Sequence, residues 1–196
     1  LSRAFFKFVE IANIFDIFSQ YSRSIQSFHL AEGPGGFIEA IQSMRMNNDD
    51  TYYGMTLLDN TNANIPGWRK SEIFLEKHPN VIIETGEDGT GNLYNPVNFN
   101  YCMQQYGNKM DIITGDGGFD FSIDFNKQEQ LAFRLILSQV AYAIGMQKYN
   151  GTFILKFFDT FMKPSMDILY ILAAFYENIH IIKPQTSRYA NSEKYV

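Results

Sequence analysis

Lys156 is the residue of this sequence whose setting points most directly to chemistry, because it lies inside the apolar run TFILKFFD, where a buried strand should turn into a loop. Desolvation and a second nearby lysine both lower a lysine pKa, whereas carboxylates raise it and fix the side chain in place. A lysine tuned toward neutrality can accept a proton, so Lys156 is a candidate general base. The alternative is a side chain that reaches solvent at the edge of a sheet.

A glycine-rich turn lies in the stretch FHLAEGPGGFIEAI, between an apolar strand and an amphipathic helix. Such a turn lets a ligand approach the main chain, and the N-terminus of the helix offers free N–H groups. Strand-to-helix connections also use glycine without binding anything, so both interpretations stay open. The spacing matches neither G-x-G-x-x-G nor the G-K-[ST] phosphate loop, which disfavours NAD and ATP.

Apolar runs and helical periodicity predict alternating strands and helices along the chain. Strands are expected before the glycine turn and over residues 51–58, 81–84, 110–114, 152–159 and 179–184. Helices are expected over residues 2–18, after Gly36, over 128–149 and over about 165–179. The strands are continuous apolar runs, which indicates an α/β fold with a doubly wound parallel sheet and helices on both faces. Ligands bind such sheets beyond the carboxyl ends of the strands.

Composition indicates one globular domain over residues 1–196, with 45% hydrophobic and 19% charged residues. The chain lacks an initial Met and stops within an apparent strand, so we expect it to be part of a longer protein. A net charge of -5 weighs against a broad basic surface for long nucleic acid. A single cysteine, Cys102, and three scattered histidines argue against a structural metal and for a reducing compartment. No apolar run approaches the length of a membrane span.

Five segments together carry a family resemblance: AEGPGGF, YYGMTLLD, DIITGDGGFD, FILKFFDTF and KPQTSRYANSEKY. In this order the chain resembles the FtsJ-like (RrmJ-type) ribose 2'-O-methyltransferases, most closely the branch that methylates the first nucleotides of capped mRNA. The resemblance implies a Rossmann-like methyltransferase fold with a mostly parallel sheet of about seven strands. It also implies a Lys-Asp-Lys-Glu tetrad formed by Lys7, Asp116, Lys156 and Glu193. For Lys7, a solvated helix lysine is the alternative, because little of the motif surrounds it.

The cofactor implied by the resemblance is S-adenosylmethionine. Its methionine part is expected against the turn formed by Gly33, Pro34, Gly35, Gly36 and Phe37, near Asp116. Its adenosine is expected near Asp59, Asp88 and Asn92, although the two aspartates also fit plain turns. The cap branch usually has an aspartate where this chain has Asn92. We therefore expect binding to persist but to be weaker.

The reaction implied is in-line attack of a ribose 2'-hydroxyl on the sulfonium methyl group. Lys156 would remove the proton of the hydroxyl, and Lys7 would lower the pKa of Lys156 or steer the hydroxyl. Asp116 and Glu193 would hold the two lysines in place. The RNA substrate is expected to contact five polar residues of the neighbouring loops. These are Lys163, Ser187, Arg188, Asn191 and Ser192.

Three other functions stay open. In the first, the chain methylates ribosomal or transfer RNA instead of capped mRNA. In the second, it is an inactive binding or scaffolding subunit. The third and least favoured is a nucleotide-dependent oxidoreductase. Abundant Asn, Ile, Phe, Tyr and Lys suggest an A/T-rich genome, and with the resemblance this suggests a large DNA virus. A location in the host cytoplasm or the virion, and other capping or transcription proteins as partners, are expected on that basis.

Overall fold

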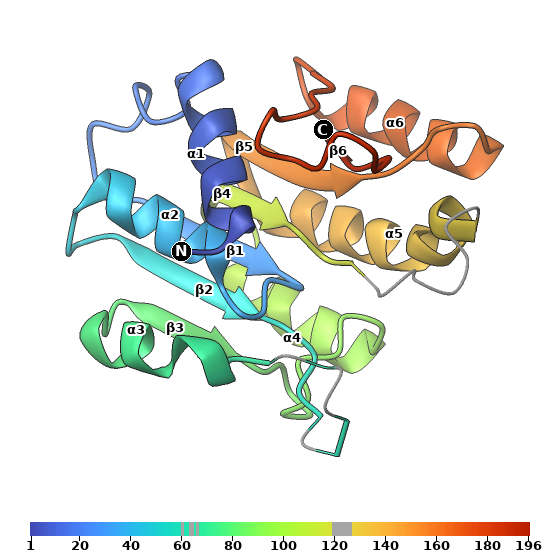
Figure 1. The fold of residues 1–196 in the computed structure, drawn as a ribbon. Helices are drawn as coiled ribbons and strands as arrows, with labels where there is room; N and C mark the ends of the chain where they lie inside the picture. The colour runs from blue at the N-terminus through green and yellow to red at the C-terminus, as the bar shows by residue number, and fades with distance from the viewer. Residues whose placement is uncertain (60, 63–64, 66, 119–126) are drawn as a thin grey trace.

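The structure of this chain, a computed structural model, describes residues 1–59, 61–62, 65, 67–118 and 127–196, and Figure 1 shows its arrangement. A six-stranded sheet, counted over these residues, has the order β3-β2-β1-β4-β5-β6. All neighbouring strands are parallel except β5 and β6, which are antiparallel. The strands are β1 (Gln26–Leu30), β2 (Thr51–Met55), β3 (Val81–Glu84), β4 (Met110–Gly115), β5 (Gln147–Phe157) and β6 (Lys194–Tyr195).

Helices cover both faces of the sheet. They are α1 (Arg3–Ile14), α2 (Gly36–Arg45), α3 (Glu72–Lys77), α4 (Pro96–Tyr106), α5 (Gln128–Met146) and α6 (Lys163–Phe175), with a 3-10 turn at Arg69–Ser71. One hydrophobic core joins α1, α2 and α3 to the sheet, and two others lie under α4, α5 and α6. The predicted α/β class, with helices on both faces of a mostly parallel sheet, is confirmed, although the described residues form six strands rather than about seven.

Local signals explain where two of the helices begin. The hydroxyl of Ser2 accepts a hydrogen bond from the N–H of Phe5 at 3.2 Å, which caps α1. Asn95 caps α4 in the same way through the N–H of Val97, and Pro96 occupies the first turn, where its missing N–H is harmless. Helix α4 was absent from the sequence prediction although this Asn-Pro signal was readable.

Several predicted boundaries were wrong. Strand β2 ends at Met55 rather than at residue 58, and β5 begins at Gln147, directly after α5, rather than at residue 152. The segment 179–184 was predicted to be a full strand, but among the described residues it contributes a single antiparallel bridge, from Ile182 to Tyr195. Within the described part of the chain, no helix is both long and apolar enough to cross a membrane.

Candidate active site

The carboxyl ends of four neighbouring strands meet at one edge of the sheet. Leu30 of β1 pairs with Met55 of β2 and with Gly115 of β4, and Gly115 pairs with Leu155 of β5. The residues that follow these partners therefore lie together. They include the glycine turn after β1, Asp116 after β4, and Lys156 near the end of β5.

Two lysine-carboxylate pairs form at this edge. Lys7 Nζ lies 2.6 Å from Glu193 Oε1, and Lys156 Nζ lies 3.3 Å from Asp116 Oδ1. The four side chains are only 10–13% exposed. The structure thus brings together all four residues of the predicted tetrad. Lys7 has only 12% of its side chain exposed and is half of an ion pair, which disfavours the alternative that it is a solvated helix lysine.

The charges of both lysines act on Glu193. Burial by itself raises the pKa of this carboxyl, but the hydrogen bond from Lys7 and the positive charge of Lys156 outweigh it and leave the pKa below the ordinary value of 4.5. Ser187 adds a hydrogen bond of 2.8 Å to Glu193 Oε1. Glu193 is therefore held as a carboxylate at neutral pH.

Tyr195 is a fully buried member of the site that sequence reasoning missed. It lies opposite Lys156 in the antiparallel pair of β5 and β6, so both side chains point to the same face. Its hydroxyl donates a 2.6 Å hydrogen bond to Asp116 Oδ1, and Lys7 Nζ lies 5.9 Å from the centre of its ring. Its position two residues after Glu193 in a strand was the available signal.

The glycine turn is explained largely by the protein's own packing. Gly35 has a φ of 98°, a conformation that favours glycine. A Cβ on Gly36 would collide with Ser2 Oγ and would approach Ala4 Cβ to 2.8 Å, so Gly36 lets α1 pack closely on α2. The side chain of Phe37 is buried against Phe8, with ring centres 5.2 Å apart. A ligand at this turn would meet backbone rather than the Phe37 ring.

Gly33 and Pro34 form the start of the same turn. A Cβ on Gly33 would lie 2.6 Å from the carbonyl oxygen of Gly67. The carbonyl oxygen of Pro34 accepts a hydrogen bond from the hydroxyl of Ser71. The turn after β1 is therefore braced by the segment that precedes α3.

Asp59, Asp88 and Asn92 lie on the loops after β2 and β3, and each has a structural partner. Asp59 accepts hydrogen bonds from the N–H and hydroxyl of Thr61 at 2.8 and 2.6 Å. Asp88 accepts from Thr90 in the same manner, and these bonds hold the pKa of Asp88 below its ordinary value. The side-chain oxygen of Asn92 accepts from the N–H of Tyr94 at 2.9 Å.

The two loops that carry these residues are joined by a 2.8 Å hydrogen bond from the N–H of Leu58 to the carbonyl oxygen of Thr90. All three predicted adenosine contacts therefore lie on one side of the glycine turn. Their own hydrogen bonds agree with the turn-residue interpretation of Asp59 and Asp88. Contact with a cofactor stays a prediction for these residues.

Of the five predicted substrate contacts, one is exposed and unpaired in the described part of the chain, and it is Arg188. Ser187 is buried and supports Glu193, while the side-chain oxygen of Asn191 accepts a 2.9 Å hydrogen bond from Lys183. Ser192 donates to Gln128 at 2.7 Å. Lys163 is 83% exposed but forms an ion pair with Asp167 at 2.7 Å. Most of this set shapes the loop around Glu193.

Glu32 is a buried carboxyl residue that sequence reasoning did not assign to the site. It is 3% exposed, and its Oε1 accepts a 2.6 Å hydrogen bond from the N–H of Phe37 at the start of α2. Its Oε2 is buried without a hydrogen-bond partner. Its position directly before the glycine turn was the available signal.

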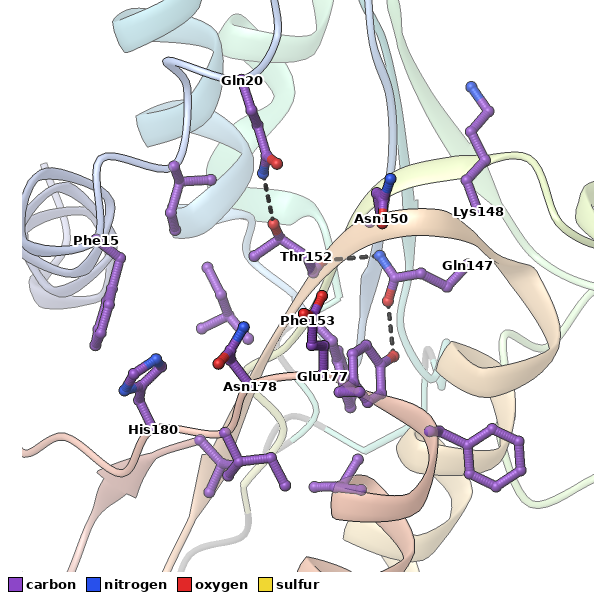
Figure 2. Close-up of a pocket in the computed structure, with 18 of the residues that line it drawn as sticks. Phe15, Gln20, Gln147, Lys148, Asn150, Thr152, Phe153, Glu177, Asn178 and His180 are labelled. Atoms are coloured by element: carbon purple, nitrogen blue, oxygen red, sulfur yellow. Dashed lines mark hydrogen bonds between the residues drawn. The ribbon is translucent and has the colours of Figure 1, made fainter.

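A large cavity of about 860 Å³ lies away from this edge. Figure 2 shows much of its lining, which comes mainly from the first eight residues of β5, from the segment around Phe15 and Gln20, and from the segment around Glu177 and His180. Tyr195 also borders this cavity. Polar contacts line it, including a 2.7 Å hydrogen bond from Tyr176 to Gln147 Oε1. Neither lysine nor carboxylate of the tetrad reaches it. In the described residues no group of three or more His, Cys, Asp or Glu could hold a metal ion.

Several solved structures with a similar fold are methyltransferases. A ribosomal RNA methyltransferase structure from Plasmodium falciparum superposes with a TM-score of 0.67 at 19% identity, covering 99% of this chain and 94% of that one. Human methyltransferase-like protein 13, solved with S-adenosylhomocysteine, superposes with a TM-score of 0.55 at 9% identity, covering 98% and 77%. At these identities the likeness establishes the fold class.

The family follows from the sequence. The model of the FtsJ-like methyltransferase family matches residues 1–196, so this chain belongs to that family. A cap-specific mRNA (nucleoside-2'-O-)-methyltransferase 1 from Trypanosoma cruzi is 33% identical over 174 residues, covering 84% of this chain and 44% of the relative. The human protein of the same name is 33% identical over 171 residues, covering 84% and 20%. The chain thus spans less than half the length of these relatives.

Proposed function

We propose that this chain is the catalytic domain of an S-adenosylmethionine-dependent RNA ribose 2'-O-methyltransferase that acts on the first transcribed nucleotides of capped mRNA. The observation that carries the proposal is the presence of two largely buried ion pairs, Lys7 with Glu193 and Lys156 with Asp116, at the carboxyl edge of the sheet. The cap-specific relatives support the choice of substrate.

The residues at this edge fit the cofactor. S-adenosylmethionine carries a sulfonium and an ammonium group, and Asp116 and Glu32 place two carboxyl groups beside the glycine turn. The turn residues Gly33–Phe37 would hold the methionine part, and the loops bearing Asp59, Asp88 and Asn92 would hold the adenosine. When bound, the cofactor supplies a methyl group already activated by its positive sulfur.

The protein then has to orient one weakly acidic hydroxyl and take its proton. In this proposal Lys156, in its neutral form, accepts the proton of the ribose 2'-hydroxyl. Asp116 fixes Lys156 through their 3.3 Å contact, and is itself held by the hydroxyl of Tyr195. Lys7, anchored by Glu193, steers the hydroxyl from the other side of the cluster. The reaction needs neither a covalent intermediate nor a metal ligand from this chain.

Arg188 is the group available for the RNA backbone. It is exposed on a loop that two hydrogen bonds hold in place. Lys183 donates to Asn191, and Ser192 donates to Gln128. An arginine held on such a loop suits a phosphate contact, which positions RNA without reading its sequence. The acidic overall charge is consistent with a short, local RNA contact rather than a long one.

Methylation of ribosomal RNA is the second candidate, favoured by the name of the Plasmodium falciparum structure. An inactive scaffold is disfavoured because such a protein would be free to lose its buried lysine-carboxylate pairs. Labelled S-adenosylmethionine should be offered with short capped RNA, the same RNA without a cap, and capped RNA already methylated at the 2' position. Label only in the capped, unmethylated RNA supports the proposal, whereas equal label in uncapped RNA transfers support to the second candidate.

Origin in a large DNA virus, a location in the host cytoplasm or virion, and partners among other capping or transcription proteins belong to the same proposal. They are supported by composition and by the cap-specific relatives alone. Cell fractionation and affinity purification from infected cells test them. Recovery of the protein with nuclear ribosomal particles would contradict this assignment.

A further inference from the structure

Glu32 lies between the glycine turn and the tetrad. Leu30 and Gly115 are paired in β1 and β4, so the residues after them run side by side, and a Cβ on Gly117 would lie 2.8 Å from Ala31 Cβ. This places Glu32 beside Asp116. One oxygen of Glu32 caps α2, and the other is buried without a partner. A carboxylate in that position lacks half of the hydrogen bonds it needs.

The charges around Glu32 come from every element packed against it. Asp116 after β4 disfavours a further negative charge, while Lys156 of β5 and the N–H groups of α2 favour one. The Tyr195 hydroxyl of β6 is protonated and adds no charge. Lys7 of α1 and Glu193 complete the cluster. Burial is the strongest influence, and together with Asp116 it holds the pKa of Glu32 well above its ordinary value.

The two lysines and the two tetrad carboxylates balance each other, so Glu32 is the group whose ionisation would unbalance the site. In the absence of a ligand, a neutral carboxylic acid is the form that this balance favours. A ligand with one net positive charge reverses the situation. It makes the ionised form of Glu32 the one that neutralises the cluster.

Resting on the proposed function, we propose that Glu32 makes the site selective for the charge of its cofactor: it is a carboxylic acid in the free protein and a carboxylate once S-adenosylmethionine is bound, its proton passing to solvent. S-adenosylmethionine has a net charge of about +1 from its sulfonium, ammonium and carboxylate groups. S-adenosylhomocysteine lacks the sulfonium and is neutral overall. Glu32 therefore stabilises the cofactor complex over the product complex.

The protons balance over one catalytic cycle. Binding of the cofactor releases the proton of Glu32 to solvent. Before the transfer step, the charged amine of Lys156 also gives its proton to solvent. In the transfer step, the ribose oxygen forms a bond to the methyl carbon, the carbon-sulfur bond breaks with its electron pair going to sulfur, and the hydroxyl proton passes to Lys156, which regains its charge. Loss of the sulfonium charge lets one proton return from solvent to Glu32. Two protons leave and one returns, so the cycle releases one proton, as the overall reaction requires.

Isothermal titration calorimetry in buffers of different ionisation enthalpy measures this directly, because a released proton adds the buffer's own heat. The wild-type chain should release a proton on binding S-adenosylmethionine and none on binding S-adenosylhomocysteine. Glu32→Gln keeps an oxygen for the N–H of Phe37 but cannot ionise. We expect it to abolish the release, to weaken S-adenosylmethionine about tenfold, and to change S-adenosylhomocysteine less than about twofold.

Sinefungin carries an amine in place of the sulfonium methyl group, so it has the positive charge without a methyl group to transfer. Its binding should release a proton and should be weakened by Glu32→Gln, as for S-adenosylmethionine. Glu39→Gln, half-buried on the helix that Glu32 caps, is the matched control and should behave as wild type. If Glu32→Gln does not fold, the wild-type protein still tests the proposal. Its affinity for S-adenosylmethionine should rise with pH, relative to that for S-adenosylhomocysteine.

Equal losses for both ligands in Glu32→Gln, or binding of S-adenosylmethionine without proton release by the wild-type chain, would overturn the role of Glu32 and leave the proposed function intact. Failure of the wild-type chain to bind either ligand would overturn both proposals. These outcomes are therefore distinguishable in one set of titrations.

Discussion

The hydroxyl of Tyr195 donates a 2.6 Å hydrogen bond to Asp116, the same carboxylate that pairs with Lys156 at 3.3 Å. Burial, together with the charges of Asp116 and Glu193, raises the pKa of Tyr195, so the phenol keeps its proton and remains a donor. Asp116 is thus held from two sides. A carboxylate that cannot rotate keeps the amine of Lys156 in one place, which proton transfer requires.

Tyr195→Phe tests this support, because it keeps the buried ring and removes only the donor. A hydrogen bond to a charged, buried acceptor contributes about 1.5–3 kcal/mol, so the free energy of unfolding should fall by about that amount. Urea denaturation measures it. Tyr149→Phe, at a residue that is 95% exposed, is the control and should leave stability unchanged. Equal stability of the two variants would show that the Tyr195 hydroxyl contributes nothing.

His29 should make the fold sensitive to mild acid. It is buried in β1 between the hydroxyls of Ser27 and Thr114, and burial lowers its pKa from 6.5 to about 3. Below pH 6.5 the unfolded chain therefore binds a proton that the folded chain does not, and stability is lost as pH falls toward 3. The loss is about 1.4 kcal/mol per pH unit, or about 2 kcal/mol between pH 6.5 and 5.

His29→Gln removes this loss, whereas His78→Gln, outside the core, should keep it. The raised pKa of Glu32 makes stability rise as pH falls, which is opposite to the effect of His29. This contribution is the same in every variant, so it cancels when the variants are compared. Urea unfolding at pH 6.5 and 5 gives the result. If His29→Gln and the wild type change equally between the two pH values, the buried histidine is not the cause.

Asn92→Asp should strengthen cofactor binding. The side-chain oxygen of Asn92 already accepts a hydrogen bond from Tyr94, and a carboxylate keeps that bond while offering a charged acceptor to the adenine amino group. A gain of about 1 kcal/mol corresponds to about fivefold in affinity. Titration with S-adenosylmethionine measures it, and Asn100→Asp, exposed on α4, adds the same charge as a control. Unchanged or weaker binding would place the adenosine elsewhere.

Sequence reasoning located the site because strand ends in a parallel sheet share one edge. The positions of Asp116, Lys156 and the glycine turn follow from the strands alone, and β3 and β4 were predicted almost to the residue. Lys7 and Glu193 came from the family resemblance. Their 2.6 Å contact joins residues 186 positions apart in the chain, and no periodicity encodes such a pairing.

The rest of the site depended on tertiary contacts. Tyr195 faces the tetrad because β6 pairs with β5 in one register, and one residue of slippage would turn it away. Ser187 reaches Glu193 from the loop before β6. Gly36 looked like a ligand contact, yet the surface it accommodates is α1 of the same chain. Short α3 was missed because its six residues give too little periodicity to detect.

In the proposed mechanism Lys156 takes the proton of the ribose 2'-hydroxyl. Methyl transfer to short capped RNA should be measured for the wild-type chain, for Lys156→Ala and for Lys77→Ala, an exposed lysine on α3, with cofactor affinity recorded for each. We predict that Lys156→Ala loses transfer by at least about 100-fold while cofactor affinity changes less than about threefold, and that Lys77→Ala behaves as wild type. Transfer by Lys156→Ala at near the wild-type rate would show that Lys156 is not the base.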